Sequence, residues 1–290
     1  MKPKAKYKIK NIAIIGLGLI GGSLAKALKE KGYKIIGIDI NSTTIKLALK
    51  EKAINKGYTQ LNSKSLENID LIFICTPLPL IKIYLTKISK LKLKNRVIIT
   101  DVGSTKEQIC RYANKISSPS PLFIGGHPMA GTEYAGFVSS KKDLFKNCAW
   151  VLTPTDKNKQ SIETLKIIIK KIDAKPIITT PKKHDEAVAL ISHLPLLVSI
   201  GLCETVKESG FMKLALTLAS SGFRDTTRIA GGNTEMNSNL LISNQLLLKK
   251  LLPKYNTNLG KIISSTKNQK NLYKKISAIS KWRNSLFTKH

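Results

Sequence analysis

The sequence predicts an α/β domain with a doubly wound, mostly parallel sheet, followed by an all-helical domain. Short apolar runs alternate with segments of helical periodicity until about residue 180, as expected of parallel strands joined by helices. Beyond Lys183 the strand signal ends and apolar residues recur at helical spacing. A length of 290 residues with 42% apolar composition suffices for two ordinary domains. We therefore predict domains at 1–180 and 181–290.

A glycine-rich turn joins the first predicted strand to the first predicted helix. Residues 11–15 predict the strand, 23–31 the helix and 34–38 a second strand. The turn has the sequence GLGLIG over residues 16–21. Such loops alone are a weak signal, but this one follows a strand and opens a helix, as in the Rossmann fold. There, two glycines let the backbone approach a pyrophosphate and the third lets helix and strand pack closely.

Small polar residues follow the next predicted strands. The apolar runs 71–75 and 97–100 predict buried strands, which end in TPLP at 76–79 and DVGS at 101–104. Open α/β sheets bind ligands at the carboxyl ends of strands, so these turns are expected to face a ligand. The other predicted elements of this domain are helices at 43–52 and 159–172 and strands at 122–125, 149–153 and 176–179.

The second domain is predicted to be helical throughout. Apolar residues recur at helical spacing in 185–209, 211–221 and 237–252, and a lysine-rich final helix follows. Pro195 lies inside the first of these helices, where it should bend the helix and free a backbone carbonyl. By itself, the nearby His193 is expected to be a hydrogen-bonded core histidine.

Asp39, at the end of the second predicted strand, indicates the cofactor. A carboxylate at this position accepts hydrogen bonds from the ribose hydroxyls of NAD and repels a 2′-phosphate. The alternative is that Asp39 only caps the strand. Lys46, one turn into the next helix, offers a positive charge for a 2′-phosphate. We therefore predict NAD as the cofactor and leave NADP open.

One histidine and two arginines are the candidate reactive side chains. A lone histidine is usually structural, but His127 lies among glycines after a predicted strand, and a neutral imidazole there can take a proton while a hydride leaves the substrate. Arg224 and Arg228 are two of five arginines in a lysine-rich chain, which favours bidentate carboxylate binding. The alternative, an Arg–Asp pair at a helix junction, is expected for one of them at most. No spacing of ligands indicates a metal.

The net charge of +31 permits a nucleic-acid-binding hypothesis. Lysines occur in every segment, however, without a basic stripe interleaved with aromatic residues. We interpret the charge as a compositional bias on solvated faces, which attracts anionic metabolites, and expect no nucleic-acid partner.

The cellular location is predicted from cysteines and hydropathy. Four cysteines without a C-x-x-C pair favour a reducing compartment. The basic start and following apolar run mimic a secretory signal, but glycines interrupt the run. No other stretch approaches the roughly 18 continuous apolar residues of a membrane helix. We expect a cytoplasmic protein with no membrane partner.

Five motifs together resemble the prephenate/arogenate dehydrogenase family, especially its cyanobacterial-type members. They are GLGLIGGS from Gly16, DVGSTK from Asp101, GGHPMAGTE from Gly125, SHLP from Ser192 and SGFRDTTRIAGG from Ser221. The resemblance implies a Rossmann domain joined to an all-helical dimerisation domain, with a homodimer and an active site in the cleft between the domains. It also implies a small dicarboxylate substrate, arogenate or prephenate, which NAD(P)⁺ oxidises with loss of carbon dioxide to tyrosine or 4-hydroxyphenylpyruvate.

The same resemblance implies roles for particular residues. His127 would deprotonate the substrate's ring hydroxyl, Ser104 would orient its imidazole, and Arg224 would bind a substrate carboxylate. Thr132, Ser192 and His193 would line the pocket. The implied cofactor contacts are Gly16, Gly18, Leu19, Ile20, Gly21, Asp39, Thr76, Pro77 and Gly103.

Leu196 departs from the family pattern. Members that use prephenate commonly have SHLPH in this motif, whereas this chain has leucine in place of the second histidine. Leucine offers no hydrogen bond to a keto side chain, whereas an ammonium group could be bound by backbone carbonyls or Glu133, which predicts a preference for arogenate. The alternative is that Leu196 only packs inside the helix and that the enzyme uses both substrates. For the function as a whole, the alternative is another Rossmann-plus-helical oxidoreductase, such as a β-hydroxyacid dehydrogenase or an imine reductase.

Overall fold

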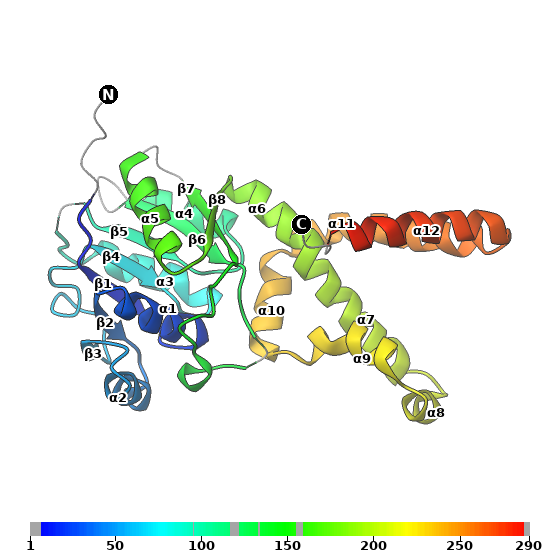
Figure 1. The fold of residues 1–290 in the computed structure, drawn as a ribbon, viewed down its shortest axis with the longest axis horizontal. Helices are drawn as coiled ribbons and strands as arrows, with labels where there is room; N and C mark the ends of the chain where they lie inside the picture. The colour runs from blue at the N-terminus through cyan, green and yellow to red at the C-terminus, as the bar shows by residue number, and fades with distance from the viewer. Residues whose placement is uncertain (1–6, 95, 117–121, 133, 155–158, 287–290) are drawn as a thin grey trace. The chain divides into compact units, whose positions relative to one another are not determined.

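The computed structural model describes residues 7–94, 96–116, 122–132, 134–154 and 159–286. The chain forms two compact units, Met1–Asn244 and Gln245–His290. The first unit contains one twisted sheet and the helices around it, followed by a series of further helices (Figure 1).

The sheet of the first unit has the strand order β3-β2-β1-β4-β5-β6-β7-β8. All neighbouring pairs in it are parallel except β6 and β7. An order that runs in both directions from β1 is the doubly wound arrangement of a Rossmann fold, which confirms the predicted fold class. The strands are β1 Asn11–Ile15, β2 Lys34–Ile38, β3 Lys56–Tyr58, β4 Leu71–Ile74, β5 Ile98–Asp101, β6 Leu122–Pro128, β7 Ala149–Pro154 and β8 Lys175–Ile178.

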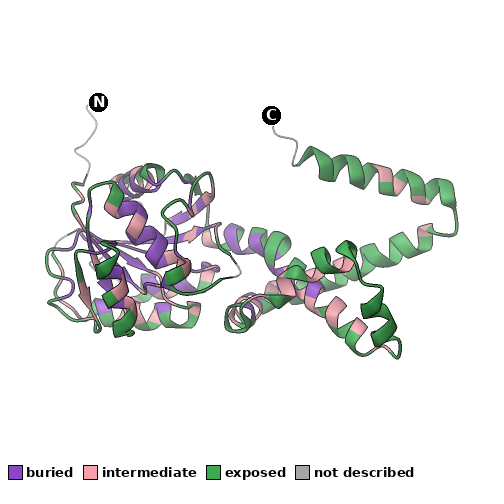
Figure 2. Ribbon diagram, turned by 60° about the horizontal axis from the view of Figure 1, so that its bottom comes forward, coloured by how far each residue is buried: buried purple, intermediate pink, exposed green. Residues whose placement is uncertain are grey.

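Helices cover both faces of this sheet, and alternate side chains of each strand reach opposite faces. In β1, Ile12 and Ile14 belong to one apolar cluster, with side chains of α1 (Leu19–Glu30), α2 (Ser42–Lys50) and α5 (Lys159–Lys171). Ala13 and Ile15 belong to the other, with α3 (Leu78–Ser89) and α4 (Glu107–Ile116). Figure 2 shows the buried residues concentrated in this part of the chain.

Several local predictions differ from the structure. The sequence did not predict β3, α3 or α4, and α1 begins at Leu19 rather than at residue 23. His127 was expected in a loop after a strand, but it lies inside β6. Antiparallel pairing with β7 extends β6, because His127 is opposite Val151 in this ladder. Pairing of this kind depends on a strand distant in sequence, which local patterns do not reveal.

A π-helical turn interrupts the first long helical stretch after the sheet. The stretch comprises α6 (Pro181–Val188), the π turn Ala189–His193 and α7 (Leu194–Lys207). Pro195 has no backbone N–H, and its ring would crowd the carbonyl of Ile191 in a regular helix. The widened turn before Pro195 relieves this crowding, so the predicted disturbance of the helix takes the form of a π turn.

The remaining helices are short in the first unit and long in the second. The predicted helix 237–252 is instead two helices that are divided at Asn244, so this prediction was wrong. Asn244 turns its side chain inward, where it bonds to His193, and this local interaction competes with helix continuation. The helices are α8 Met212–Thr217, α9 Ser221–Thr227, the 3₁₀ turn Arg228–Gly231 and α10 Thr234–Ser243, then α11 Gln245–Ser265 and α12 Gln269–Ser285.

By length and composition alone, one helical stretch in the described residues, 181–207, could cross a membrane. Its mean hydropathy reaches 1.8 over an 18-residue window, of which 28% is buried. The sequence analysis expected no such segment, because no run in it is continuously apolar. Apolar helices that pack against other protein pass the same test, so the stretch is weak evidence for a membrane.

Candidate active site

The predicted ligand-facing turns meet at the carboxyl edge of the sheet. Ile15, Ile74 and Asp101 are register partners at the ends of three parallel strands. The glycine turn, Thr76 and Gly103 follow these strands, while His127 lies near the end of the adjacent β6. The doubly wound topology therefore brings the candidate cofactor and catalytic residues to one edge.

The three glycines of the turn have different roles. Gly16 has φ +90°, and a Cβ there would lie 2.8 Å from the Cys75 carbonyl oxygen. A Cβ on Gly21 would lie 1.9 Å from the Gly16 oxygen, so these two glycines allow turn, strand and helix to pack. Beside Gly18, by contrast, a Cβ would meet no atom within 4 Å. Gly18 is also the N-cap of α1, and it has no side chain to bond to the first backbone N–H groups of the helix. This end of α1 therefore offers space and N–H donors to a phosphate.

Three further features fit a dinucleotide at this edge. The Asp39 carboxylate accepts hydrogen bonds from the backbone N–H groups of Leu17 (2.7 Å) and Asn41 (2.9 Å), which fix it beside the glycine turn. Within the described residues the buried Thr76 hydroxyl has no hydrogen-bond partner. Leu19 and Ile20 form the first turn of α1, and Pro77 is the N-cap of α3. The residues present therefore suit NAD, whose ribose and phosphates need such donors and acceptors.

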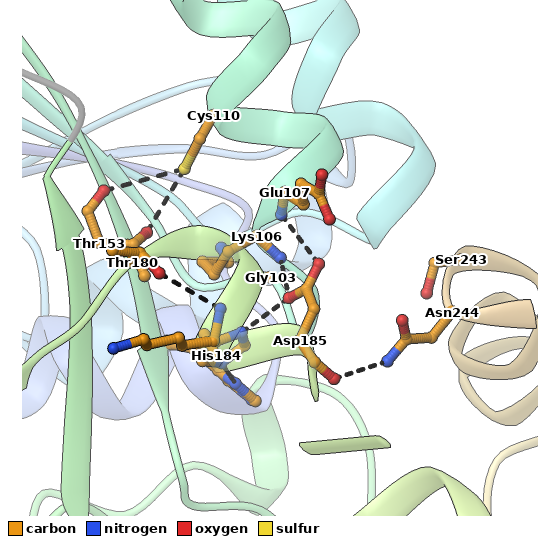
Figure 3. Close-up of polar contacts among 12 residues, drawn as sticks. Gly103, Lys106, Glu107, Cys110, Thr153, Thr180, His184, Asp185, Ser243 and Asn244 are labelled. Carbon is orange, nitrogen blue, oxygen red and sulfur yellow. Dashed lines mark hydrogen bonds and ion pairs between the residues drawn. The ribbon is translucent and has the colours of Figure 1, made fainter. Parts of the chain in front are cut away.

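His127 is hydrogen-bonded to a second histidine that the sequence analysis did not identify. Its Nδ1 lies 2.9 Å from Nε2 of His184, and the two rings are arranged edge to face. Nδ1 of His184 lies 2.8 Å from Oδ1 of Asp185. Asp185 also accepts hydrogen bonds from the backbone N–H groups of Lys106 (2.7 Å) and Glu107 (2.9 Å), where α4 begins. Figure 3 shows Asp185 between His184 and these two backbone groups.

A buried ion pair holds the backbone next to His127. Asp101 and Lys106 are both fully buried and bonded to each other. Lys106 donates to the Gly126 carbonyl oxygen (2.8 Å), while Asp101 accepts from the Gly126 N–H (3.0 Å). A Cβ on Gly126 would lie 2.5 Å from the Asp101 carbonyl oxygen. Gly126 therefore permits close packing of β5 and β6.

Burial, together with the nearby His184, Lys106 and His193, lowers the pKa of His127 well below its usual value. Burial lowers the pKa of His193 to about 4, although the negative charge of Asp185 opposes this shift. His193 is also bonded to Asn244 (3.0 Å), as expected for a core histidine. At neutral pH His127 is therefore uncharged and has a free lone pair with which to accept a proton.

The other expected site residues have less defined surroundings. Among the described residues no hydrogen bond joins Ser104 to His127. Thr132 is exposed and bonds within its own loop, to Tyr134 (3.3 Å). Ser192 is exposed at the π turn, whereas Leu196 is buried. Glu133, considered as a partner for an ammonium group, lies outside the described residues.

Arg224 is exposed on α9, a helix that contacts α7. Its Nε lies 3.2 Å from Oδ1 of the neighbouring Asp225, and both side chains are largely in solvent. Within the described residues no ion pair is seen for Arg228. The guanidinium of Arg224 therefore retains most of its donors for another carboxylate.

The structure adds four residues to the candidate site: Asp101, Lys106, His184 and Asp185. Asp101 and Lys106 both lie in the DVGSTK motif, so a search for charges inside motifs would have found them. His184 and Asp185 are adjacent to the predicted domain boundary and had no such signal. No group of histidine, cysteine or carboxylate side chains in the described residues could hold a metal ion.

Comparisons with known protein families agree with this geometry. The family model for the nucleotide-binding domain of prephenate dehydrogenase matches residues 24–178. The model for the dimerization domain of prephenate dehydrogenase matches residues 180–276. The two models together cover most of the chain.

Individual relatives belong to the same group. A prephenate dehydrogenase of Bacillus subtilis is 32% identical over 238 residues, which span 81% of this chain and 64% of the relative. The crystal structure of Synechocystis arogenate dehydrogenase superposes with a TM-score of 0.84 at 35% identity, covering 95% of this chain and 99% of that one. Prephenate dehydrogenase from Aquifex aeolicus, in complex with hydroxyphenyl propionate and NAD⁺, superposes with a TM-score of 0.88 at 27% identity, covering 97% and 99%.

Proposed function

Because this chain belongs to the prephenate dehydrogenase family, we propose that it catalyses the NAD-dependent oxidative decarboxylation of arogenate, prephenate or both, a reaction of tyrosine biosynthesis. The observation that carries the proposal is the position of His127, an uncharged imidazole at the carboxyl edge of the sheet. The glycine turn, with open space beside Gly18, lies at the same edge. Prephenate and arogenate both have the ring hydroxyl that such a base would deprotonate.

Each residue of the proposed site has a separate role in the reaction. The glycine turn would hold NAD⁺, which when bound would supply the acceptor for the hydride of the hydroxyl-bearing ring carbon. His127 takes the hydroxyl proton through Nε2, since its Nδ1 is bonded to His184. Arg224 binds the side-chain carboxylate and thereby orients the ring. When the bond to the ring carboxylate breaks, its electron pair enters the ring, carbon dioxide leaves and the ring becomes aromatic. The phenolate oxygen then takes back the proton from His127, which gives the phenol.

The second domain, whose boundary we place near residue 180, is proposed to form a homodimer. The dimerization model begins at residue 180, between β8 and α6. Helices after this point expose large apolar side chains, for example Phe211, Leu218 and Ile242, each of them more than half exposed. A second copy would cover such surfaces. We propose that the protein is a cytoplasmic homodimer without nucleic-acid or membrane partners.

An assay of NAD⁺ reduction with candidate substrates tests the proposed activity. Arogenate and prephenate are expected to support NADH formation with release of carbon dioxide, whereas 3-hydroxyisobutyrate is not. Activity with 3-hydroxyisobutyrate alone would instead favour a β-hydroxyacid dehydrogenase. Salt-sensitive DNA binding without any dehydrogenase activity would contradict the enzyme proposal altogether.

NAD⁺ is expected to be preferred over NADP⁺. Asp39 lies beside the glycine turn with both carboxylate oxygens facing backbone donors, and its negative charge repels a 2′-phosphate. The measurement is kcat/KM for both cofactors in the wild type and in an Asp39→Asn variant. In the Asp39→Asn variant, the ratio of kcat/KM for NAD⁺ to kcat/KM for NADP⁺ should be smaller than in the wild type. Equal values for the two cofactors in the wild type would show that Asp39 does not discriminate.

Arogenate is expected to be preferred over prephenate because of Leu196. The side chain is buried in α7 and has no polar atom for a keto group. When a keto oxygen loses its water and gains no hydrogen-bond donor, the binding free energy becomes less favourable by about 1–3 kcal/mol. An ammonium group would not need a donor at this position. The values of kcat/KM for each substrate are compared in the wild type and in Leu196→His. A gain of prephenate activity in the variant supports this role, and a wild-type preference for prephenate contradicts it.

A further inference from the structure

His127 is the end of a continuous hydrogen-bonded series. From His127 the series passes to His184 and then to Asp185, with distances of 2.9 Å and 2.8 Å. Both His184 and Asp185 are almost completely buried. They come from α6, whereas His127 comes from β6, so the series joins the helical segment to the sheet.

The donors around Asp185 determine the direction of every hydrogen bond in the series. Oδ1 of Asp185 accepts from the Lys106 N–H and Oδ2 accepts from the Glu107 N–H. Backbone N–H groups can only donate, so the carboxylate acts as an acceptor, and Nδ1 of His184 must donate to Oδ1. When the ring of His184 carries this single proton, its Nε2 is an acceptor, and the Nδ1–H of His127 donates to it.

This direction leaves the lone pair of His127 on Nε2. A neutral imidazole carries one proton, so a histidine whose Nδ1–H is donated presents a basic Nε2 to its surroundings. When Nε2 takes a proton, the imidazolium keeps its Nδ1–H bond to His184. The bond becomes stronger because its donor is now charged.

We infer that His184 and Asp185 are positioning residues that fix the tautomer of His127. This inference rests on the proposed function, in which His127 is the base. Asp185 also bonds to Asn244 through its backbone carbonyl oxygen (3.1 Å), and the same amide bonds to His193. Asn244 therefore helps to hold α6 in position (Figure 3).

The tautomer can be observed directly by nitrogen-15 NMR of the imidazole rings. The chain has four histidines, so each spectrum can be assigned by single substitutions. In the wild type, neutral His127 is expected to carry its proton on Nδ1. In His184→Leu, which has no acceptor, it should carry the proton on Nε2. In His184→Gln the amide oxygen still accepts from Nδ1–H, so the wild-type tautomer is expected.

Kinetics of the same variants give an independent result. His184→Leu should lower kcat about 10- to 100-fold, the range of one charge-assisted hydrogen bond, with KM for NAD⁺ unchanged. His184→Gln should restore most of kcat. Lys183→Gln, an exposed neighbour on α6, is the matched control and should change neither the spectrum nor kcat.

Asp185→Asn provides a second variant if His184→Leu does not fold. The amide cannot accept from all three donors, so His184 is expected to reverse its hydrogen bonds and His127 to carry its proton on Nε2. A wild-type His127 that is protonated on Nε2, or a tautomer unchanged in His184→Leu, would overturn the inference. If the wild type shows the Nδ1–H tautomer but oxidises neither substrate, the proposed function fails and the positioning inference stands.

The pH profile separates positioning from structural support. The charged and titratable groups facing His127 are His184 and Asp185 of α6, Lys106 before α4 and His193 of the π turn. Without the acceptor on His184, the lone pair of His127 is expected on Nδ1, away from the substrate, so kcat/KM should fall at every pH in His184→Leu and return in His184→Gln. A variant with a lower melting temperature but an unchanged profile would contradict the positioning role.

Discussion

Replacement of His127 by asparagine is expected to lower kcat by about 10²- to 10⁴-fold, the usual loss when a general base is removed. The amide of asparagine can still donate to His184, so the local hydrogen-bonded structure should persist, but the group has no basic nitrogen. The affinity for NAD⁺ should change little, because the glycine turn and Asp39 follow other strands of the sheet, β1 and β2. Stopped-flow measurement of NADH formation and titration of NAD⁺ binding test both parts.

The pH dependence provides the control for this variant. Burial, with the nearby Lys106 and histidines, lowers the pKa of His127, so the imidazole remains unprotonated below pH 6.5, where an ordinary histidine would be charged. Wild-type kcat/KM should therefore persist into more acidic solution before it declines, and this decline should be absent in His127→Asn. Near-normal kcat in the variant would remove His127 from the role of base.

The second large effect is expected for Arg224→Ala, which should chiefly raise KM for the dicarboxylate substrate. A hydrogen bond to a charged group contributes about 1.5–3 kcal/mol, which corresponds to a change of about 10- to 100-fold in binding. The side chain is exposed and its contact with Asp225 is a surface pair, so the fold should not depend on it. The values of kcat and KM are measured separately, because loss of ground-state binding raises KM without changing kcat.

Two further variants make this prediction specific to the guanidinium. Arg224→Lys retains the positive charge but cannot bind a carboxylate in a bidentate manner, so its KM should lie between those of the wild type and Arg224→Ala. Arg228→Ala serves as the matched control, since Arg228 lies in the adjacent 3₁₀ turn. If KM is unchanged in Arg224→Ala and raised in Arg228→Ala, the carboxylate partner is Arg228.

The sequence by itself determined the elements whose signals are local. Alternating apolar runs predicted the strands from 11–15 to 176–179, and the glycine turn between a strand and a helix predicted the Rossmann fold. Five motifs identified the family without any structure. These signals succeed because strand burial and turn geometry are encoded within a few consecutive residues.

Only the tertiary structure decided which side chains meet. Asp101 and His184 are far apart in the sequence, yet the sheet topology brings Asp101 to the backbone of Gly126, and the start of α6 brings His184 to the adjacent His127. Pairing with β7 placed His127 in a strand, and the inward bond of Asn244 divided a predicted helix. The reason is physical: a hydrogen bond between distant residues leaves no periodic pattern in the sequence, since only the folded backbone determines which donor faces which acceptor.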